Sequence, residues 1–202
     1  MELSSPTLIL RYPRSDDAPR LLELASEPDV TRWFSWGPYT SIEQPLAYIE
    51  RLVGQRERGE QLDLLVVHRS DGPIGITGLS EFSMRDRRCM VGTWFGKPWW
   101  GTGANRESKA VMSHLAFEVL GMNRLGSYSN PDNVRSTRAL EGVGFSREGV
   151  LRAWHRHGDR FLDVNVFGML RAEWEGGPLR EIPVAVAGDP PPAFSGRGAG
   201  RV

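Results

Sequence analysis

Apolar residues recur along this chain with two different periods, and the alternation between them predicts the order of the elements. Short apolar runs with the length and composition of strands occupy residues 8–12, 62–67, 74–79 and 90–95. The dipeptide Asp71-Gly72 between the second and third runs is typical of a hairpin turn. Between the first and second runs, two segments show the spacing of amphipathic helices. The predicted order is therefore one strand, two helices and three strands.

Capping and stop signals set the limits of these two helices. The first begins after Asp16 or Asp17, either of which can cap it, and ends at Pro28. Its apolar side carries Leu21, Leu22 and Leu24. The second opens at residues 41–44 and ends near Gly59. We expect it to bury Leu46, Ile49, Leu52 and Val53.

The second half of the chain predicts a long helix, a fifth strand, a shorter helix and a hairpin. The long helix covers about residues 104–120, with Gly121 as its stop. Its core side carries Val111, Met112, Leu115, Ala116 and Val119, and its outer side Arg106, Lys109 and Ser113. The fifth strand, residues 125–129, leads to a helix that ends near Gly142. Either Asn130 or Asn133 can cap that helix, and Pro131 at the first helical position favours Asn130. The hairpin is formed by residues 145–151 and 161–170.

Composition divides the chain into a single domain, residues 1–175, and a tail, residues 176–202. In the tail 11 of 27 residues are Gly or Pro, so we expect it to have little core of its own. Lys and Arg balance Asp and Glu at 25 each, so no overall field favours nucleic acid or an acidic membrane as a partner. No apolar run approaches the roughly 20 residues of a membrane span and no signal segment opens the chain, which predicts a cytoplasmic protein.

Cysteine and histidine give no sign of a metal site. Cys89 is the single cysteine, which excludes an internal disulfide and argues against a four-ligand zinc site. Its place in a predicted strand favours a buried, inert thiol. His155 and His157 flank one position beside Gly158-Asp159, a pattern typical of a solvated hairpin face.

A glycine loop between the fourth strand and the long helix is the strongest candidate for a binding site. Two tryptophans precede Gly101-Thr102-Gly103, and a helix follows. Glycines let backbone N–H groups approach a ligand closely, and the helix adds unpaired N–H groups and a positive dipole end, which suit phosphate. The dinucleotide fingerprint fails because Arg106 occupies its third glycine position, and the Walker pattern is absent. A structural turn explains the loop equally well when it is taken alone.

An aromatic segment without clear periodicity follows the first helix. It contains Trp33, Phe34, Trp36 and Tyr39. These side chains could pack against the sheet, or they could form the wall of a substrate pocket.

Downstream residues add a resemblance to a known family. The segment from Asn133 to Phe145 matches NxxSxxxLExxGF, which resembles the signature of the GNAT superfamily of acyl-CoA-dependent N-acetyltransferases. The tryptophan-glycine loop and the closing DxxxFxxLRxEW pattern, Asp163 to Trp174, are most similar to the ribosomal-protein N-terminal acetyltransferase-like, or Rim-type, branch. The resemblance spans about residues 8–174.

This resemblance implies an α+β fold with a mixed, mostly antiparallel sheet flanked by helices. The fourth and fifth strands, residues 90–95 and 125–129, would splay apart to admit the pantetheine arm of acetyl-CoA, the acyl donor. The backbone of Trp94 and Phe95 would pair with the pantetheine amides, Asn133 would hold the donor near the splay, and Ser136 would face its sulfur. The pyrophosphate would be bound by Trp100, Gly101, Thr102, Gly103, Ala104 and Asn105.

The sequence departs from the family pattern at three positions. Pro98 replaces the Gln or Arg that usually begins the loop, and it removes one donor to phosphate. Leu140 stands where many members have a tyrosine that protonates the leaving thiolate. Met90 stands where a carboxylate is common in this branch, so the general base must lie elsewhere.

Acetyl transfer to an amine requires a neutral nitrogen, a polarised carbonyl and a stabilised thiolate. An amide near Phe95 could meet the carbonyl oxygen. Given Leu140, Ser136 is the best available donor to the thiolate, although it could also be a first-turn serine bonded to its own backbone. Glu81, at the end of the third predicted strand, is the first choice of base, and Asp163 and His155 follow. Each of these three residues could instead have a structural role, and water can replace a protein base.

Two other functions remain open at this stage. The missing tyrosine and carboxylate would suit a non-catalytic acyl-CoA-binding protein, and the glycine loop alone would suit a nucleotide-sensing regulatory module. The sequence does not identify the amine acceptor, which could be a small molecule or a protein N-terminus. The tail could pack around a second subunit, so a homodimer is also left open.

Overall fold

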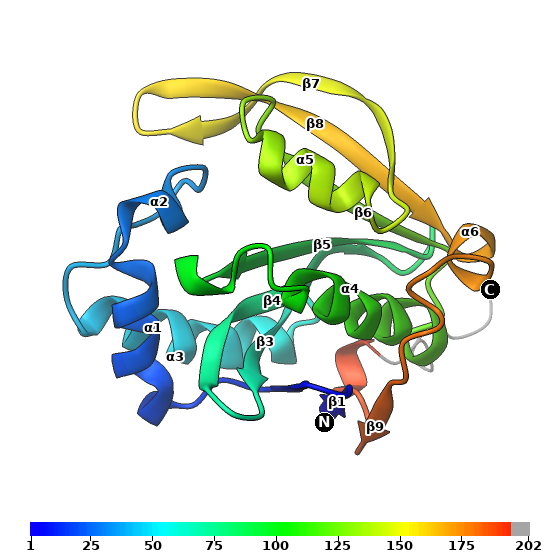
Figure 1. Cartoon of the computed structure of the whole chain (residues 1–202), viewed down its shortest axis with the longest axis horizontal. Coiled ribbons are helices and arrows are strands. Elements are labelled where there is room, and N and C mark those ends of the chain that lie inside the picture. Colours follow the sequence, from blue (N-terminus) through cyan, green and yellow to red (C-terminus); the bar gives the residue numbers. More distant parts are fainter. Residues whose placement is uncertain (195–202) are drawn as a thin grey trace.

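Nine strands form one sheet in the computed structural model, which describes residues 1–194. Their order across the sheet is β7-β8-β6-β5-β4-β3-β2-β1-β9 (Figure 1). The bounds are Glu2–Ser4 (β1), Leu8–Arg11 (β2), Gln61–His68 (β3), Gly72–Ser83 (β4), Arg88–Phe95 (β5), Arg124–Ser129 (β6), Ser146–His157 (β7), Arg160–Leu170 (β8) and Ala185–Ala187 (β9). All neighbouring strands are antiparallel except β5 and β6, so the predicted mixed, mostly antiparallel sheet is confirmed.

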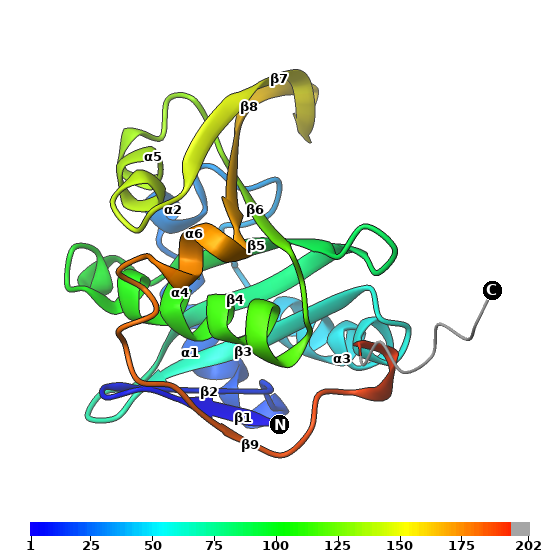
Figure 2. The same ribbon diagram turned by 90° about the vertical axis from the view of Figure 1, so that its right-hand side faces the viewer.

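Helices cover both faces of the sheet (Figure 2). They are α1 (Ala18–Ala25), α2 (Pro28–Thr31), α3 (Glu43–Glu57), α4 (Ala104–His114), α5 (Val134–Glu141) and α6 (Arg171–Glu175). Helix α4 continues into a π-helical turn, η3 (Leu115–Val119), and the short 3-10 turns are η1 (Ser15–Asp17), η2 (Lys97–Trp99) and η4 (Pro192–Phe194). Within the described residues, no helix is long and apolar enough to cross a membrane.

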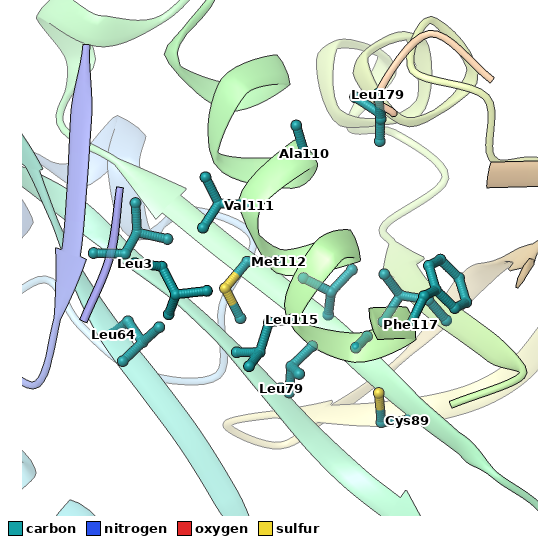
Figure 3. Packing of buried hydrophobic residues seen from close by; sticks show 14 of the residues in the cluster. Leu3, Leu64, Leu79, Cys89, Ala110, Val111, Met112, Leu115, Phe117 and Leu179 are labelled. Atoms are coloured by element: carbon teal, nitrogen blue, oxygen red, sulfur yellow. The ribbon is translucent and has the colours of Figure 1, made fainter. Parts of the chain in front are cut away.

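Strand β3 is buried on both sides, which explains its nearly continuous apolar run. Leu64 belongs to the main core with Met112 of α4 and Leu115 of η3, as Figure 3 shows. Leu65 points to the opposite face, where it packs in a second cluster with Leu21 of α1 and Ile49 of α3. The central strands therefore lie between α4 on one face and α1 with α3 on the other.

Cys89 lies in the main core, as predicted, and only 1% of it is exposed (Figure 3). Burial raises the pKa of its thiol to about 12, so the thiol stays protonated and inert at neutral pH.

The parallel contact between β5 and β6 is short, and its end is the most important feature of the sheet. The register pairs Arg88 with Arg124, Cys89 with Leu125 and Met90 with Gly126, and no further pair follows. One position later the Ser127 hydroxyl donates to the carbonyl of Val91 at 2.9 Å, so a side chain takes over where backbone pairing stops. The predicted splay between these two strands is confirmed.

Glycine at position 126 permits the close approach just before the strands separate. A Cβ there would lie 2.3 Å from the sulfur of Met90, so glycine leaves room for the Met90 side chain in its present position. Met90 therefore covers the point of divergence on one face of the sheet.

Several helix predictions need correction. In α3 only Ile49 and Leu52 of the predicted apolar set are buried, whereas Leu46 is 38% and Val53 44% exposed, because α3 meets its neighbours along a narrow stripe. Helix α4 is buried over the whole stretch 108–113, since it is enclosed on several sides. Lys109 and Ser113 are thus inside the protein and do not face outward as predicted.

Local capping also differs from the sequence-based expectation. The Asn133 side chain, and not that of Asn130, caps α5 by accepting from the backbone N–H of Ser136 at 3.2 Å. The Asp17 side chain does not cap α1; it forms a salt bridge with Arg11 at 2.8 Å and accepts from the N–H of Arg14. Pro28 begins α2, and two residues separate it from the end of α1.

Residues 176–194 contribute only two buried side chains, Leu179 and Phe194, but they are attached to the domain. Strand β9 pairs with β1, a strand that the sequence analysis did not find. Leu179 and Phe194 are 1% and 0% exposed, and the Phe194 ring packs against Phe82 with centroids 4.8 Å apart. The remaining predicted tail, residues 195–202, lies outside the described residues.

We expect Phe194→Ala to lower the free energy of unfolding by about 3–5 kcal/mol, because it leaves a cavity beside Phe82. The matched control is Phe161→Ala on β8, where the ring is 63% exposed and the change should stay within about 0.5 kcal/mol. Chemical denaturation of both variants gives the comparison. Equal losses of stability would contradict the packed position of Phe194.

Candidate active site

A cavity of about 710 Å³ opens where β5 and β6 diverge. Its wall contains eight of the ten predicted cofactor residues: Trp94, Phe95, Trp100, Gly101, Gly103, Asn105, Asn133 and Ser136. Thr102 and Ala104 instead line a separate cavity of about 360 Å³, which Gly103 also lines. The splay therefore leads into a space that runs from the glycine loop to β6 and α5.

The glycine loop adopts a conformation that depends on its glycines. Gly101 and Gly103 have φ values of +76° and +94°, in the left-handed region that side chains disfavour. A Cβ at either position would meet no atom within 4 Å, so backbone conformation, not crowding, requires glycine there. Gly103 stands at the N-cap of α4, where the first-turn amides have no intrahelical acceptor. The loop thus presents N–H groups and the positive end of a helix dipole to one place.

Trp100 connects the loop to the strand and to α5. Its indole N–H donates to the carbonyl of Phe95 at 2.9 Å. The Arg135 guanidinium lies 3.2 Å from the centre of the Trp100 ring, and it also lines the cavity. Arg106 and Arg138 line it as well, so several positive charges border the cavity. Such a field suits a phosphorylated ligand.

Helix α5 brings Asn133 and Ser136 to the same wall. The Asn133 side-chain oxygen is used in capping, which leaves its NH₂ group as the donor. Within the described residues the Ser136 hydroxyl makes no hydrogen bond, whereas its backbone N–H is bound by the cap. Leu140, also in the wall, is 4% exposed and has no polar group to offer.

Lys109 is a cavity residue that the sequence analysis assigned to an outer helix face. It is 3% exposed, and its ammonium nitrogen donates to the hydroxyl of Thr93 on β5. Burial lowers the pKa of Lys109 to about 7. The spacing of apolar residues along α4 could not reveal that Lys109 is buried, because it does not show that β5 and the cavity lie against the polar side of the helix.

A polar cluster occupies the other end of the cavity. The Tyr128 hydroxyl on β6 donates to the Glu81 carboxylate at 3.2 Å, and the His155 ring lies 5.6 Å from that of Tyr128. Burial, followed by the neighbouring Glu81 carboxylate, raises the pKa of Tyr128. Burial, followed by the charge of His157, lowers the pKa of His155. The predicted base Glu81 is therefore in the cavity, within a cluster that includes one residue the sequence analysis missed, Tyr128.

Glu81 is held there by an unusual backbone. It lies inside β4 and not at a strand end as predicted, with φ of +51° at a register shift between Ser80 and Ser83. Asp163 does not line the cavity, because its carboxylate accepts from the N–H of Ala153 at 2.8 Å on the hairpin.

The aromatic segment packs against itself and the sheet, and part of it also lines the cavity. Trp36 stacks between Phe34 and Tyr39, with ring centroids 5.2 Å apart in each pair, and its edge meets Trp94 at 5.7 Å. Trp33, Phe34 and Trp36 line the cavity, whereas Tyr39 supports Trp36 from outside it. Trp154 of β7, which the sequence analysis did not select, lines the same space.

The glycine loop at the start of α4 and the diverging pair of parallel strands thus border one cavity. In comparisons with known proteins, a family model described as an acetyltransferase (GNAT) domain matches residues 7–146. The Bacillus licheniformis protein named uncharacterized N-acetyltransferase p20 is 28% identical over 179 residues, covering 86% of this chain and 98% of that protein. A crystal structure of a presumed acetyltransferase from T. thermophilus is 30% identical with a TM-score of 0.76, covering 87% and 92% of the two chains.

The chain belongs to the GNAT acetyltransferase family, and it is an enzyme of the acyl-CoA-dependent N-acetyltransferase type. Bacillus subtilis YdaF, named as a presumed ribosomal N-acetyltransferase, is 25% identical over 175 residues, covering 84% of this chain and 94% of that protein. The resemblance found in the sequence is therefore confirmed. Among the described residues, no group of three His, Cys, Asp or Glu side chains could hold a metal ion.

We expect Gly103→Ala to weaken CoA binding roughly tenfold, because a side chain at a φ of +94° costs about 1–2 kcal/mol and turns the loop amides away from the phosphates. Gly158→Ala is the matched control: it has φ of +58°, lies in the β7–β8 turn and has no neighbour within 4 Å of a Cβ. Titration calorimetry with CoA should show the loss only in the loop variant.

Proposed function

We propose that this enzyme transfers the acetyl group of acetyl-CoA to a primary amine by direct attack within a ternary complex. The observation that carries the proposal is the single cavity that joins the glycine loop, the splay and the aromatic end. A donor that enters along the loop and an acceptor that enters past the aromatic residues would meet at the splay. No covalent acyl-enzyme is then required.

The donor would be bound largely by backbone. The loop amides and α4 would hold the pyrophosphate, with Arg135 and Trp100 beside it. Beyond Met90, the β5 edge that faces β6 is released from backbone pairing, so Trp94 and Phe95 can pair with the pantetheine amides as an added strand would. The NH₂ group of Asn133 would complete the site near the splay.

The acceptor would occupy the end formed by Trp33, Phe34 and Trp36. Of the described residues that line the cavity, Glu81 is the single carboxylate. One carboxylate among aromatic rings suits one cationic amine on an apolar body, through cation–π contacts and one ion pair. This composition supports a protein N-terminus or a small monoamine over a polyamine, and the ribosomal name of YdaF favours the same choice.

The chemistry can be followed by its bonds and protons. The neutral amine attacks the thioester carbon, the C–N bond forms and the C–S bond breaks. Glu81, or water beside it, receives the proton of the attacking nitrogen, while the unbound hydroxyl of Ser136 donates a hydrogen bond to the departing sulfur.

Ser136→Ala should lower kcat about tenfold or more while leaving the Kd for CoA within about twofold, because the hydroxyl is expected to act on the thiolate that forms during the reaction. Thiol release measured with a thiol reagent, beside calorimetry, separates the two quantities. Unchanged turnover would remove Ser136 from the mechanism.

Glu81→Gln should lower kcat/KM for monoamines by about 10²-fold, because the variant loses both the charge and the base.

The experiment on the acceptor compares an N-terminal peptide amine, an aryl-alkyl monoamine and spermidine at equal concentration. The expected order places both monoamines ahead of spermidine in the native enzyme. CoA binding without thiol release from any amine would instead support a binding protein, and displacement of CoA by ATP would support a nucleotide sensor.

A further inference from the structure

Lys109 is a buried cation that the proposed reaction leaves unused. Its side chain is 3% exposed, and among the described residues it forms no ion pair with a carboxylate. Burying an ammonium without an opposite charge is costly, so such a group either loses its proton or receives an anion from a ligand. Lys109 also lines the cavity at the splay, where the donor's arm is expected to lie.

Hydrogen bonds fix the direction in which Lys109 donates. Thr77 Oγ1 donates to the carbonyl of Gly92 at 3.1 Å and lies 2.7 Å from Thr93 Oγ1. Because the proton of Thr77 is committed to that carbonyl, Thr93 must donate to Thr77 and accept from the amine of Lys109. The amine is therefore a donor on its strand side, and its remaining protons are available to a ligand.

The side chains of neighbouring elements determine the electrostatic surroundings of Lys109. The other charged or titratable side chains that line the same cavity are Arg106 of α4, Arg135 and Arg138 of α5, Glu81 of β4, Tyr128 of β6, and His155, Arg156 and His157 of β7. The lowered pKa of Lys109 has burial as its cause, with no carboxylate opposing it. Glu81 is already bound to Tyr128, which leaves Lys109 without a partner of opposite charge.

We propose that Lys109 is a catalytic residue that neutralises the sulfur leaving from the acyl donor, in the role left open by Leu140. As the C–S bond breaks, the electron pair goes to sulfur and the Lys109 ammonium gives its proton to the thiolate. The products are the free thiol and a neutral amine on Lys109, which regains a proton from solvent as the product departs. Ser136 supplies a second hydrogen bond to the same atom. This inference rests on the proposed function.

The acidity of Lys109 matches this transfer. Its pKa of about 7 lies below the roughly 8.5 of an ordinary alkyl thiol, so the proton moves downhill to sulfur. An ordinary lysine near 10.4 would hold the proton more strongly than the thiolate. By linkage, a thiolate in the site must raise the pKa of Lys109 as much as Lys109 lowers that of the thiol.

The test uses a feature of the sequence: Lys97 and Lys109 are its two lysines. In protein labelled with ¹³C at the lysine ε-carbon, Lys97→Arg assigns the two signals, and each can be titrated with pH. With CoA bound, we expect Lys109 to titrate at least one pH unit higher than with desulfo-CoA, which keeps the phosphates and lacks the sulfur. Equal pKa values with the two ligands would overturn the role of Lys109, whereas failure of both to bind would overturn the proposed function itself.

Two variants provide an independent measurement. Lys109→Met, which fills similar volume without charge, should raise the pH at which the thiol of bound CoA ionises, followed by the ultraviolet absorbance of the thiolate, and lower kcat at least tenfold with an unchanged Kd for CoA. Lys97→Met, at an exposed lysine paired with Asp29, should change neither quantity. An unaltered pH of thiol ionisation in Lys109→Met, or acetyl found on Lys109 by mass spectrometry after turnover, would refute the proposal, because an acetylated lysine has no proton to give.

Discussion

The end of backbone pairing between β5 and β6 is the constraint on which the rest of the site depends. Three residue pairs hold the strands together, and the Ser127 hydroxyl then replaces the ladder at Val91. From there the released strand edge, the cavity and the approach to α5 all follow. A sheet that continued its pairing through Phe95 would have no space for the arm of a thioester, whatever residues formed the loop. The glycine loop and the aromatic end are placed on either side of this opening.

Helix α4 holds that opening in position. Its N-terminus follows the glycine loop, its middle carries Lys109 against β5, and its later residues Val111 and Met112 pack into the main core. Helix α4 therefore connects the main core to residues that line the cavity. Burial all around α4 makes its position rigid, and a rigid helix keeps the loop amides aimed at one place.

Local signals in the sequence predicted the elements well and the surroundings of the elements poorly. The strand pairs, the glycine loop and the splay could be inferred because turn residues, apolar runs and family motifs are written locally in the chain. The burial of Lys109, the contact between Tyr128 and Glu81 and the packing of Phe194 depend on residues far apart in sequence. The local signal of Pro131 favoured Asn130 as the cap of α5, whereas the path of the chain after β6 makes Asn133 the cap.

The addition of β9 to β1 has a consequence for solubility. Both strands are only three residues long, and β9 covers hydrogen-bonding groups of β1 that would otherwise form an open border of the sheet. An uncovered border invites pairing with strands of other molecules, whereas a short outermost strand offers them little template. The segment after α6 thus acts as a guard against self-association, and a protease that removed it would leave an enzyme with an intact active site and a tendency to aggregate.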